Sequence, residues 1–272
     1  MDTTQLTLIL RKDKFTRGVF QGVYPSDTAV RDAWFVEADA VTAAPEADGN
    51  ALPTDMQVVG AVQRSAGADT VVMCAAGTMP GELHKLWKAG APGSYHMEYG
   101  YSCMGYEIAG GIGVKLADPN RDVVIMLGDG SHMMMNSELA TAATLGIKLT
   151  VVITDNRGVG CINRLQQATG GVEFNNLLDT ALHEVPSNID FVAHAASMGA
   201  EAVKVGSIAE LEEALARARE ASGPFVAVID TDPYPSTEAG GTWWEVAVPE
   251  VSERDEVRAA RAEYEAALKA RV

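Results

Sequence analysis

The chain has 272 residues, of which 47% are hydrophobic and 26 are glycine, and this is enough to bury the core of one large α/β domain with appendages. Its 21 basic and 37 acidic residues give a formal charge of −16, which argues against nucleic acid or an anionic membrane surface as a partner. An anionic ligand would need a metal ion or a helix N-terminus to hold it.

The cysteine pattern and the N-terminus bear on the cellular compartment. Cys74, Cys103 and Cys161 are odd in number and form no CxxC pair, so neither a disulfide framework nor a zinc site is expected. The N-terminus lacks the pattern of a secretory leader, and no apolar run approaches the roughly 18 residues that span a bilayer. We expect a soluble protein of the cytoplasm.

Residues 1–50 are predicted to be an N-terminal extension. The stretch "TLILRKDKF" (7–15) has the composition of a strand, and the loop "AAPEADGN" (43–50) is the predicted boundary. By its position, this extension is expected to be an arm that contacts a partner or a replacement for a lost linking domain.

Residues 51–233 alternate helical and apolar strand patterns. Helices are predicted at 52–67, 104–117, 132–146, 190–199 and 207–220, and strands at 70–76, 122–127, 149–155, 200–205 and 224–232. Apolar strands in this alternation predict an α/β fold with a parallel sheet covered by helices on both faces. Residues 234–272 are predicted to form a tail that ends in a charged surface helix. In this tail, "GGTWW" (240–244) is a candidate lid, with buried packing as the alternative.

Two polar residues, Asp129 and Asn156, directly follow predicted strands. Ligands of parallel sheets lie at the carboxyl ends of the strands, so these side chains are expected to meet there. A carboxylate and an amide oxygen suit Mg²⁺, which often completes its shell with phosphates. However, "GDG" and "DN" are also common turn dipeptides, and the residue types alone leave both interpretations open.

The residues around Asp129 favour a phosphate ligand. Gly128 and Gly130 permit close approach of the backbone, and Ser131 is expected to cap the next helix, whose N-terminus attracts anions. The predicted ligand is a Mg²⁺-bound diphosphate.

The stretch "GDGSHMMMNSELATAATLGIKLTVVITDN" (128–156) resembles the diphosphate-binding motif of thiamine-diphosphate enzymes, which runs from GDG to an Asn over about thirty residues. The resemblance covers about residues 53–232. It implies that Asp129, Asn156 and the main-chain carbonyl of Gly158 bind Mg²⁺, which in turn holds thiamine diphosphate.

Further stretches narrow this resemblance. "AAGTMPGELHKLW" (75–87), "HMEYGYSCMGYEIAGGIGVKLADPNRDVVIMLGDGS" (96–131), "GCINRLQ" (160–166) and "GGTWW" are similar to the C-terminal domain of trihydroxycyclohexanedione hydrolases, which open a cyclic 1,2-diketone. Met104 aligns with the apolar residue that lies under the bend of the cofactor in related enzymes. Without its flanking motif, Met104 would be interpreted as a core methionine.

The resemblance also implies a missing half. In this superfamily a glutamate on a pyrimidine-binding domain activates the cofactor, and residues 1–50, whose glutamates are Glu37 and Glu46, cannot build such a domain. We therefore expect a separate pyrimidine-binding subunit that carries the activating glutamate, in a heterotetramer or larger assembly. A fragment or a degenerate half is the alternative.

Other residues are candidates for contacts with substrate or cofactor. His96 and Glu98 precede Met104 and are expected to exchange protons with a carbonyl substrate, whereas a structural role is the alternative for both. His132 is expected to touch the diphosphate or to cap the helix. Gly77 and Thr78 end the first strand and are expected near the pyrimidine, unless they form a plain strand-to-helix turn.

The expected function is therefore carbon–carbon bond cleavage or formation next to a carbonyl, with hydrolysis of a cyclic 1,2-diketone as the first candidate. A two-subunit 2-oxoacid decarboxylase or an acyloin-forming carboligase is the alternative. A non-catalytic scaffold subunit is the rival of another class. A nicotinamide dehydrogenase is disfavoured because "AGGIGVK" (109–115) does not form GxGxxG after a strand.

Overall fold

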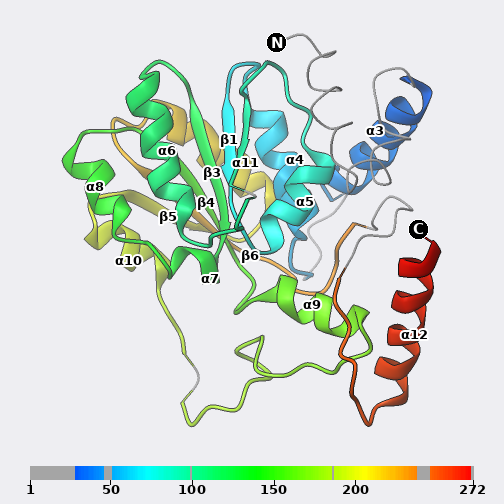
Figure 1. The fold of residues 1–272 in the computed structure, drawn as a ribbon. Helices are drawn as coiled ribbons and strands as arrows, with labels where there is room; N and C mark the ends of the chain where they lie inside the picture. Colours follow the sequence, from blue (N-terminus) through cyan, green and yellow to red (C-terminus); the bar gives the residue numbers. More distant parts are fainter. Residues whose placement is uncertain (1–27, 46–50, 99, 186, 238–245, 271–272) are drawn as a thin grey trace. The chain divides into compact units, whose positions relative to one another are not determined.

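The computed structural model describes residues 28–45, 51–98, 100–185, 187–237 and 246–270 (Figure 1). Residues 42–163 and 174–236 form one compact unit, and residues 1–41, 164–173 and 237–272 belong to a second. Within the described residues, no helix is long and apolar enough to cross a membrane. The predicted strand at 7–15 and the candidate lid "GGTWW" lie outside the described residues.

The larger unit is built on a six-stranded sheet in which every pairing is parallel. The strands are β1 (Val71–Cys74), β2 (Tyr95–Met97), β3 (Val123–Gly128), β4 (Thr150–Asp155), β5 (Glu201–Val205) and β6 (Phe225–Asp230), in the order β2-β1-β3-β4-β6-β5. The predicted parallel α/β fold is confirmed.

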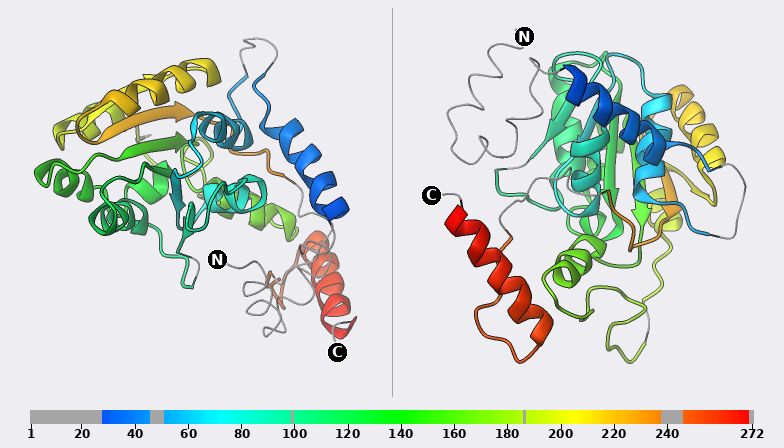
Figure 2. Two further views of the ribbon diagram at one scale, coloured as in Figure 1. Left: turned by 90° about the horizontal axis from the view of Figure 1, so that it is seen from above. Right: turned by 90° about the vertical axis from the view of Figure 1, so that its right-hand side faces the viewer.

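Helices cover both faces of this sheet because its central strands are apolar on both sides. One face packs against α6 (Tyr106–Ala117), α8 (Glu138–Thr144) and α10 (Phe191–Ser197). The other packs against α4 (Asp55–Ser65), α5 (Thr78–Leu86) and α11 (Ile208–Glu220) (Figures 1 and 2). All four residues of β1 are buried, as are the first five of β3, β4 and β6. Parallel sheets of this kind place their ligands beyond the carboxyl ends of the strands.

The helices α4 and α11 of the larger unit begin at side-chain caps. Ser207 caps α11 by accepting a hydrogen bond from the backbone N–H of Glu210 at 3.2 Å. Ser207 and Glu210 do not form a full capping box, because the Glu210 carboxylate accepts from Gly206 N at 2.8 Å. Thr54 and Gln57 form a complete capping box at α4.

The predicted helix at 132–146 is wrong as a single element. The chain forms a short α7 (Asp129–His132), a turn, and then α8. At the turn, Met134 and Met135 pass close to Gly105, where an added Cβ would lie 3.0 Å from the Cβ atoms of both methionines. The chain therefore bends around the loop that precedes α6, and no local pattern announces this bend.

Several elements were not predicted. They are α3 (Thr28–Thr42), α5, β2 and α9 (Gly160–Ala168). The strand β2 has three half-buried residues at the edge of the sheet, so it lacks the fully apolar pattern of the central strands.

In the smaller unit, α12 (Asp255–Ala270) is the predicted charged helix, and it buries Val257. Its first turn packs against Gly170, where an added Cβ would lie 2.5 Å from the backbone of Glu256. The Arg254 side chain also donates to Gly170 O at 3.3 Å.

Candidate metal and cofactor site

Asp129 and Asn156 lie at the carboxyl ends of neighbouring strands. Asp129 begins α7 directly after β3, and Asn156 directly follows β4, with Gly128 opposite Thr154 in the register of the two strands. Only 5% of Asp129 and 4% of Asn156 is exposed. Both residues are therefore buried at the carboxyl ends of adjacent strands, and their shared role as metal ligands stays a prediction.

These side chains present oxygens without hydrogen-bond donors. Asp129 Oδ2 accepts from the backbone N–H of Gly158 at 2.8 Å, whereas in the described part of the chain nothing donates to Asp129 Oδ1 or Asn156 Oδ1. Buried polar atoms nearly always have a hydrogen-bond partner. Two buried oxygens without one, both at the carboxyl end of the sheet, therefore indicate a ligand. A hard cation satisfies both oxygens at once.

Gly158 completes the arrangement through its backbone. Its φ is 150°, and an added Cβ would lie 2.3 Å from Asn176 O, so a larger residue does not fit. The backbone on either side is held by hydrogen bonds from Val159 N to Asn176 O (2.8 Å) and from Leu178 N to Arg157 O (2.7 Å). The Gly158 carbonyl oxygen lies 3.2 Å from the place of a Cβ on Gly130, at the turn that carries Asp129.

The electrostatic environment of Asp129 favours a bound cation. The pKa of this carboxyl is raised to about 7, mainly by burial and secondly by the nearby Asp155, while the N–H groups of Gly158, Gly130 and Asn156 oppose the rise. Burial also raises the pKa of Asp155. A positive ion between these groups would restore the charged form of Asp129.

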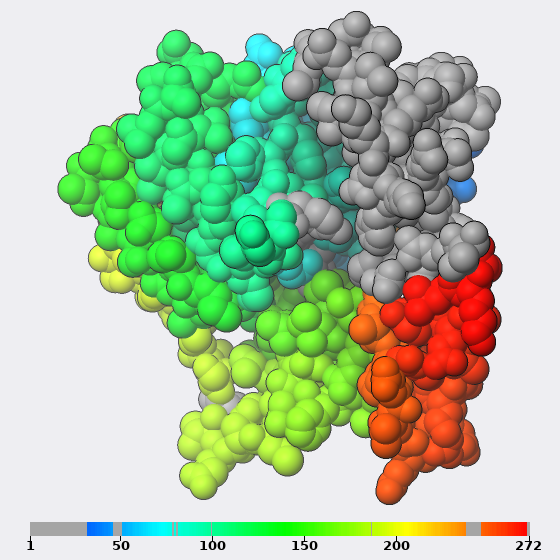
Figure 3. Space-filling view, in the orientation of Figure 1, coloured from blue at the N-terminus to red at the C-terminus, as the bar shows by residue number. Residues whose placement is uncertain are grey.

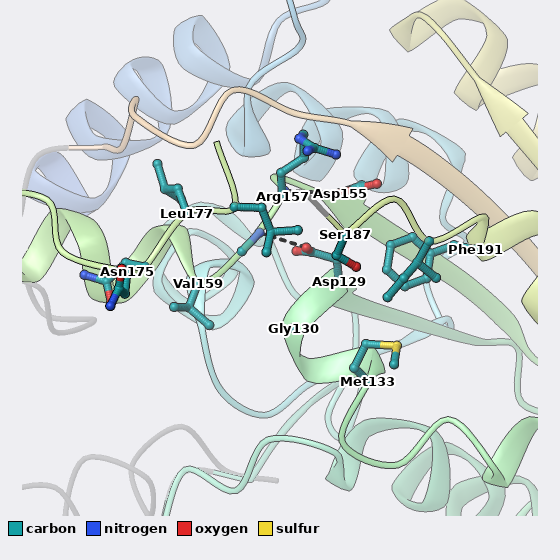
Figure 4. A pocket seen from close by; sticks show the side chains of 14 residues that line it. Asp129, Gly130, Met133, Asp155, Arg157, Val159, Asn175, Leu177, Ser187 and Phe191 are labelled. Carbon is teal, nitrogen blue, oxygen red and sulfur yellow. Dashed lines mark hydrogen bonds between the residues drawn. The ribbon is translucent and has the colours of Figure 1, made fainter. Parts of the chain in front are cut away.

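A cavity of about 310 Å³ opens beside Asp129 (Figure 4). Its walls come from the turn after β3, the loop after β4 and the segment 174–191, which contributes Asn175 to Leu178, Ser187, Ile189 and Phe191. In Figure 3 this segment forms the yellow-green lobe at the lower left. Arg157 is the one basic residue among the lining side chains, and its guanidinium pairs with Asp179 at 2.9 Å. An anion in this cavity would therefore depend on a metal and on backbone N–H groups.

Met104 lies next to the same turn. Its Cε is 3.6 Å from the position of a Cβ on Gly130, which is an ordinary van der Waals distance, so Met104 packs beside this turn. Gly77, at φ 98°, precedes α5 at the end of β1, and Thr78 is the first residue of that helix. Because β1 pairs with β3, Gly77 and Thr78 lie at the same edge of the sheet as Asp129, although Gly77 does not line the cavity.

The predicted capping role of Ser131 is wrong. The N-cap of α7 is Gly128, and Ser131 lies within the helix. Its hydroxyl instead donates to Glu107 Oε1 at 2.5 Å and accepts from Gly105 N at 3.1 Å. The Ser131 hydroxyl is therefore bound to the Glu107 carboxylate of α6 and does not cap a helix.

His132 occupies a packed environment and does not line the cavity. Its buried ring contacts Phe191 and His194, with Nε2 3.3 Å from His194 Nδ1. Burial, and to a lesser extent His194, lowers the pKa of His132 to about 4. The imidazole is therefore neutral at physiological pH, and its contact with a diphosphate stays a prediction.

His96 and Glu98 have structural partners of their own. His96 lies in β2, not in a loop, and its Nε2 is 2.9 Å from the Tyr106 hydroxyl. Glu98 accepts from the backbone N–H groups of Cys103 (2.7 Å) and Tyr101 (3.0 Å), which lower its pKa. Glu98 thus organises the loop before Met104 as a carboxylate, and the catalytic roles of both residues stay predictions.

Sequence reasoning missed Glu107, which is fully buried in the first turn of α6. The signal was present, because Glu107 is the acidic residue in "MGYEIAGG", a run otherwise made of small and apolar residues and one tyrosine. A charge on the buried side of such a helix indicates a specific partner.

Fold and site together define the class of this protein. Residues 75–229 match the family model described as "Thiamine pyrophosphate enzyme, C-terminal TPP binding domain". The chain belongs to this family of thiamine-diphosphate-binding domains.

Individual proteins of known name are also similar to this chain. The chain is 41% identical over 215 residues to 3D-(3,5/4)-trihydroxycyclohexane-1,2-dione hydrolase 2 of Bacillus cereus, covering 76% of this chain and 33% of that protein. It is 40% identical over 200 residues to the 3D-(3,5/4)-trihydroxycyclohexane-1,2-dione hydrolase of Bacillus licheniformis, covering 74% and 31%. The chain therefore spans about a third of the length of these relatives.

A solved structure shares the fold. The thiamine diphosphate-dependent 4-hydroxybenzoylformate decarboxylase of Rhodococcus jostii RHA1 superposes with a TM-score of 0.60 at 20% identity, over 71% of this chain and 35% of that one. At this identity the likeness extends to the fold alone.

Proposed function

We propose that this chain is the diphosphate- and Mg²⁺-binding subunit of a split thiamine-diphosphate-dependent enzyme that cleaves or forms carbon–carbon bonds next to a carbonyl. The observation that carries the proposal is the pair of buried, unpaired oxygens of Asp129 and Asn156 beside the Gly158 carbonyl. A domain that had lost the cofactor would have no use for two such oxygens at the end of its sheet.

In this proposal Asp129, Asn156 and the Gly158 carbonyl hold Mg²⁺, and the ion holds the diphosphate in the cavity. The bound cofactor supplies a nucleophilic carbon and an electron sink for chemistry at a carbonyl. Met104 supports the cofactor from the side of Gly130. His96 and Glu98 are the proposed groups that orient a carbonyl substrate or exchange its protons, with Glu98 as an acceptor because its carboxylate form is favoured.

A separate subunit is proposed to supply the pyrimidine-binding half, with the glutamate that activates the cofactor. Support comes from the single parallel sheet of the larger unit and from the relatives, which are about three times as long as the part they share with this chain. The proposed assembly is a heterotetramer or larger, located in the cytoplasm.

The proposed first substrate is a cyclic 1,2-diketone that is opened by hydrolysis. Support comes from the printed names of the relatives at 41% and 40% identity. A 2-oxoacid decarboxylase or a carboligase differs in its products, because the former releases carbon dioxide and the latter an acyloin.

The test is a calorimetric titration of thiamine diphosphate into the chain, isolated with any partner that copurifies, with and without Mg²⁺. We expect binding that requires Mg²⁺ and is abolished in Asp129→Ala. The control Asp118→Ala changes an exposed carboxylate at the end of α6 and should bind as the wild type does. Binding that is independent of Mg²⁺, or unchanged in Asp129→Ala, would refute the metal site, and no binding at all would favour the scaffold function.

A further inference from the structure

Glu107 is a fully buried carboxylate that the proposed function does not use. It lies in the first turn of α6 with 0% of its surface exposed, and it is not among the residues that line the cavity. Burying a carboxylate is costly unless its oxygens are hydrogen-bonded. Both of its oxygens accept hydrogen bonds, and the donors belong to two segments that Glu107 thereby connects.

The donors come from two separate segments of the chain. Ser131, in the turn of Asp129, donates its hydroxyl to Glu107 Oε1 at 2.5 Å. Gly105, next to Met104, donates its backbone N–H to Glu107 Oε2 at 2.9 Å and also to Ser131 Oγ at 3.1 Å. The three groups form a closed, buried network that ties the loop of Met104 to the metal-binding turn.

This network fixes a backbone that has little freedom to move. Gly105 has a φ of 93°, and an added Cβ would lie 3.0 Å from the Cβ atoms of Met134 and Met135. On the other side of Met104, Cys103 N is held by Glu98 at 2.7 Å. Met104 is thus placed between two backbone anchors, each of which is a carboxylate.

We propose that Glu107 is a positioning residue that couples the Met104 loop to the turn of Asp129 through the Ser131 hydroxyl. The proposal rests on the proposed function, since that function assigns Met104 and Asp129 to one cofactor. The role requires two acceptor oxygens, because Glu107 accepts from an N–H and an O–H at once. Glutamine offers one acceptor oxygen and an NH₂ group, so Glu107→Gln keeps the size of the side chain and breaks the network.

The test is a double-mutant cycle on thiamine diphosphate binding at saturating Mg²⁺, using the isolated complex. Removal of the residues that support a ligand shell typically weakens binding about 10-fold to 100-fold, and we expect losses of this size in Glu107→Gln and in Ser131→Ala. Because the two residues act as one unit, the double variant should lose no more than the worse single variant. The control Glu82→Gln changes another buried glutamate, on α5, and should leave the affinity unchanged.

A second readout separates this proposal from the proposed function. Without cofactor, hydrogen exchange should be faster in Glu107→Gln than in the wild type, both in peptides covering residues 101–107 and in peptides covering 129–135. If the wild type binds no thiamine diphosphate, the proposed function fails and the exchange data alone judge the coupling. Fully additive losses, or exchange that changes in one segment only, would overturn the proposal. Should Glu107→Gln not fold, hydrogen exchange in Ser131→Ala decides: it should be faster than in the wild type in both segments, and a change in one segment only would overturn the proposal.

Discussion

Asp129 is the proposed metal ligand, and it is also the residue whose charge is unfavourably buried in the absence of metal. Its pKa rises from the ordinary value of 3.8 to about 7, mainly because the carboxyl is buried and secondly because Asp155 is close. Between these two pH values the folded chain holds a proton that the unfolded chain has lost. The free energy of unfolding should therefore decrease as the pH rises from about 4 to about 7.

This contribution is removed by Asp129→Asn, which has no proton to lose. Without metal, we expect the wild type to lose up to about 4 kcal/mol of stability relative to Asp129→Asn between pH 4 and pH 8. Urea unfolding of both proteins at several pH values measures this difference, and the comparison cancels the titration of other groups such as His132. Equal pH dependence in the two proteins would show that Asp129 ionises normally.

At the residue scale, the sequence predicts the site residues that lie at the ends of strands. Asp129 and Asn156 were found because each directly follows an apolar run, and the sheet brings such positions together. The partner of Ser131 was not found, since Glu107 is 24 residues away along the chain and its contact depends on how α6 packs. The contacts of the His132 ring with Phe191 and His194 also depend on tertiary packing, because both partners are far away along the chain.

At the scale of elements, the close packing of α6 on the sheet positions Met104 and Glu107. An added Cβ at Gly111 would lie 2.6 Å from Ile125 Cδ1 in β3, and one at Gly110 would lie 2.8 Å from Met73 Sδ in β1. The glycines therefore allow the helix to approach β1 and β3.

Gly111→Val should destabilise the protein by about 1–3 kcal/mol, because its methyl groups overfill a closely packed core. The matched control is Gly113→Ala, in the same helix, where nothing lies within 4 Å of the added Cβ. This control should be neutral or stabilising by up to about 1 kcal/mol, since alanine favours a helix. Thermal unfolding of both variants tests the prediction, and an equal effect would mean that α6 does not depend on close approach.

Elements with a strong period were predicted, and short or edge elements were not. The helices α4 and α11 have caps and an apolar stripe, and β3 and β4 have five buried residues each. In contrast, β2 has three half-buried residues, and the turn between α7 and α8 contains methionines, which favour a helix. Tertiary contact with Gly105 overrides that local preference.

At the scale of the whole molecule, the acidic charge and the cavity agree. A chain of charge −16 whose cavity contains one paired arginine has little positive charge to offer a diphosphate, so the metal becomes the main electrostatic contact. The parallel fold and the family follow from strand patterns and one motif. The partner has no such signal, since its contacts depend on surfaces and not on periodicity.

The most direct test of the split-enzyme account is a native mass spectrum of the chain, affinity-purified from its own cells with Mg²⁺ and thiamine diphosphate. We predict a complex with a second polypeptide large enough for a pyrimidine-binding domain, and a cofactor mass that disappears in Asp129→Ala. A homo-oligomer without cofactor, or a single longer polypeptide that contains both halves, would contradict the account.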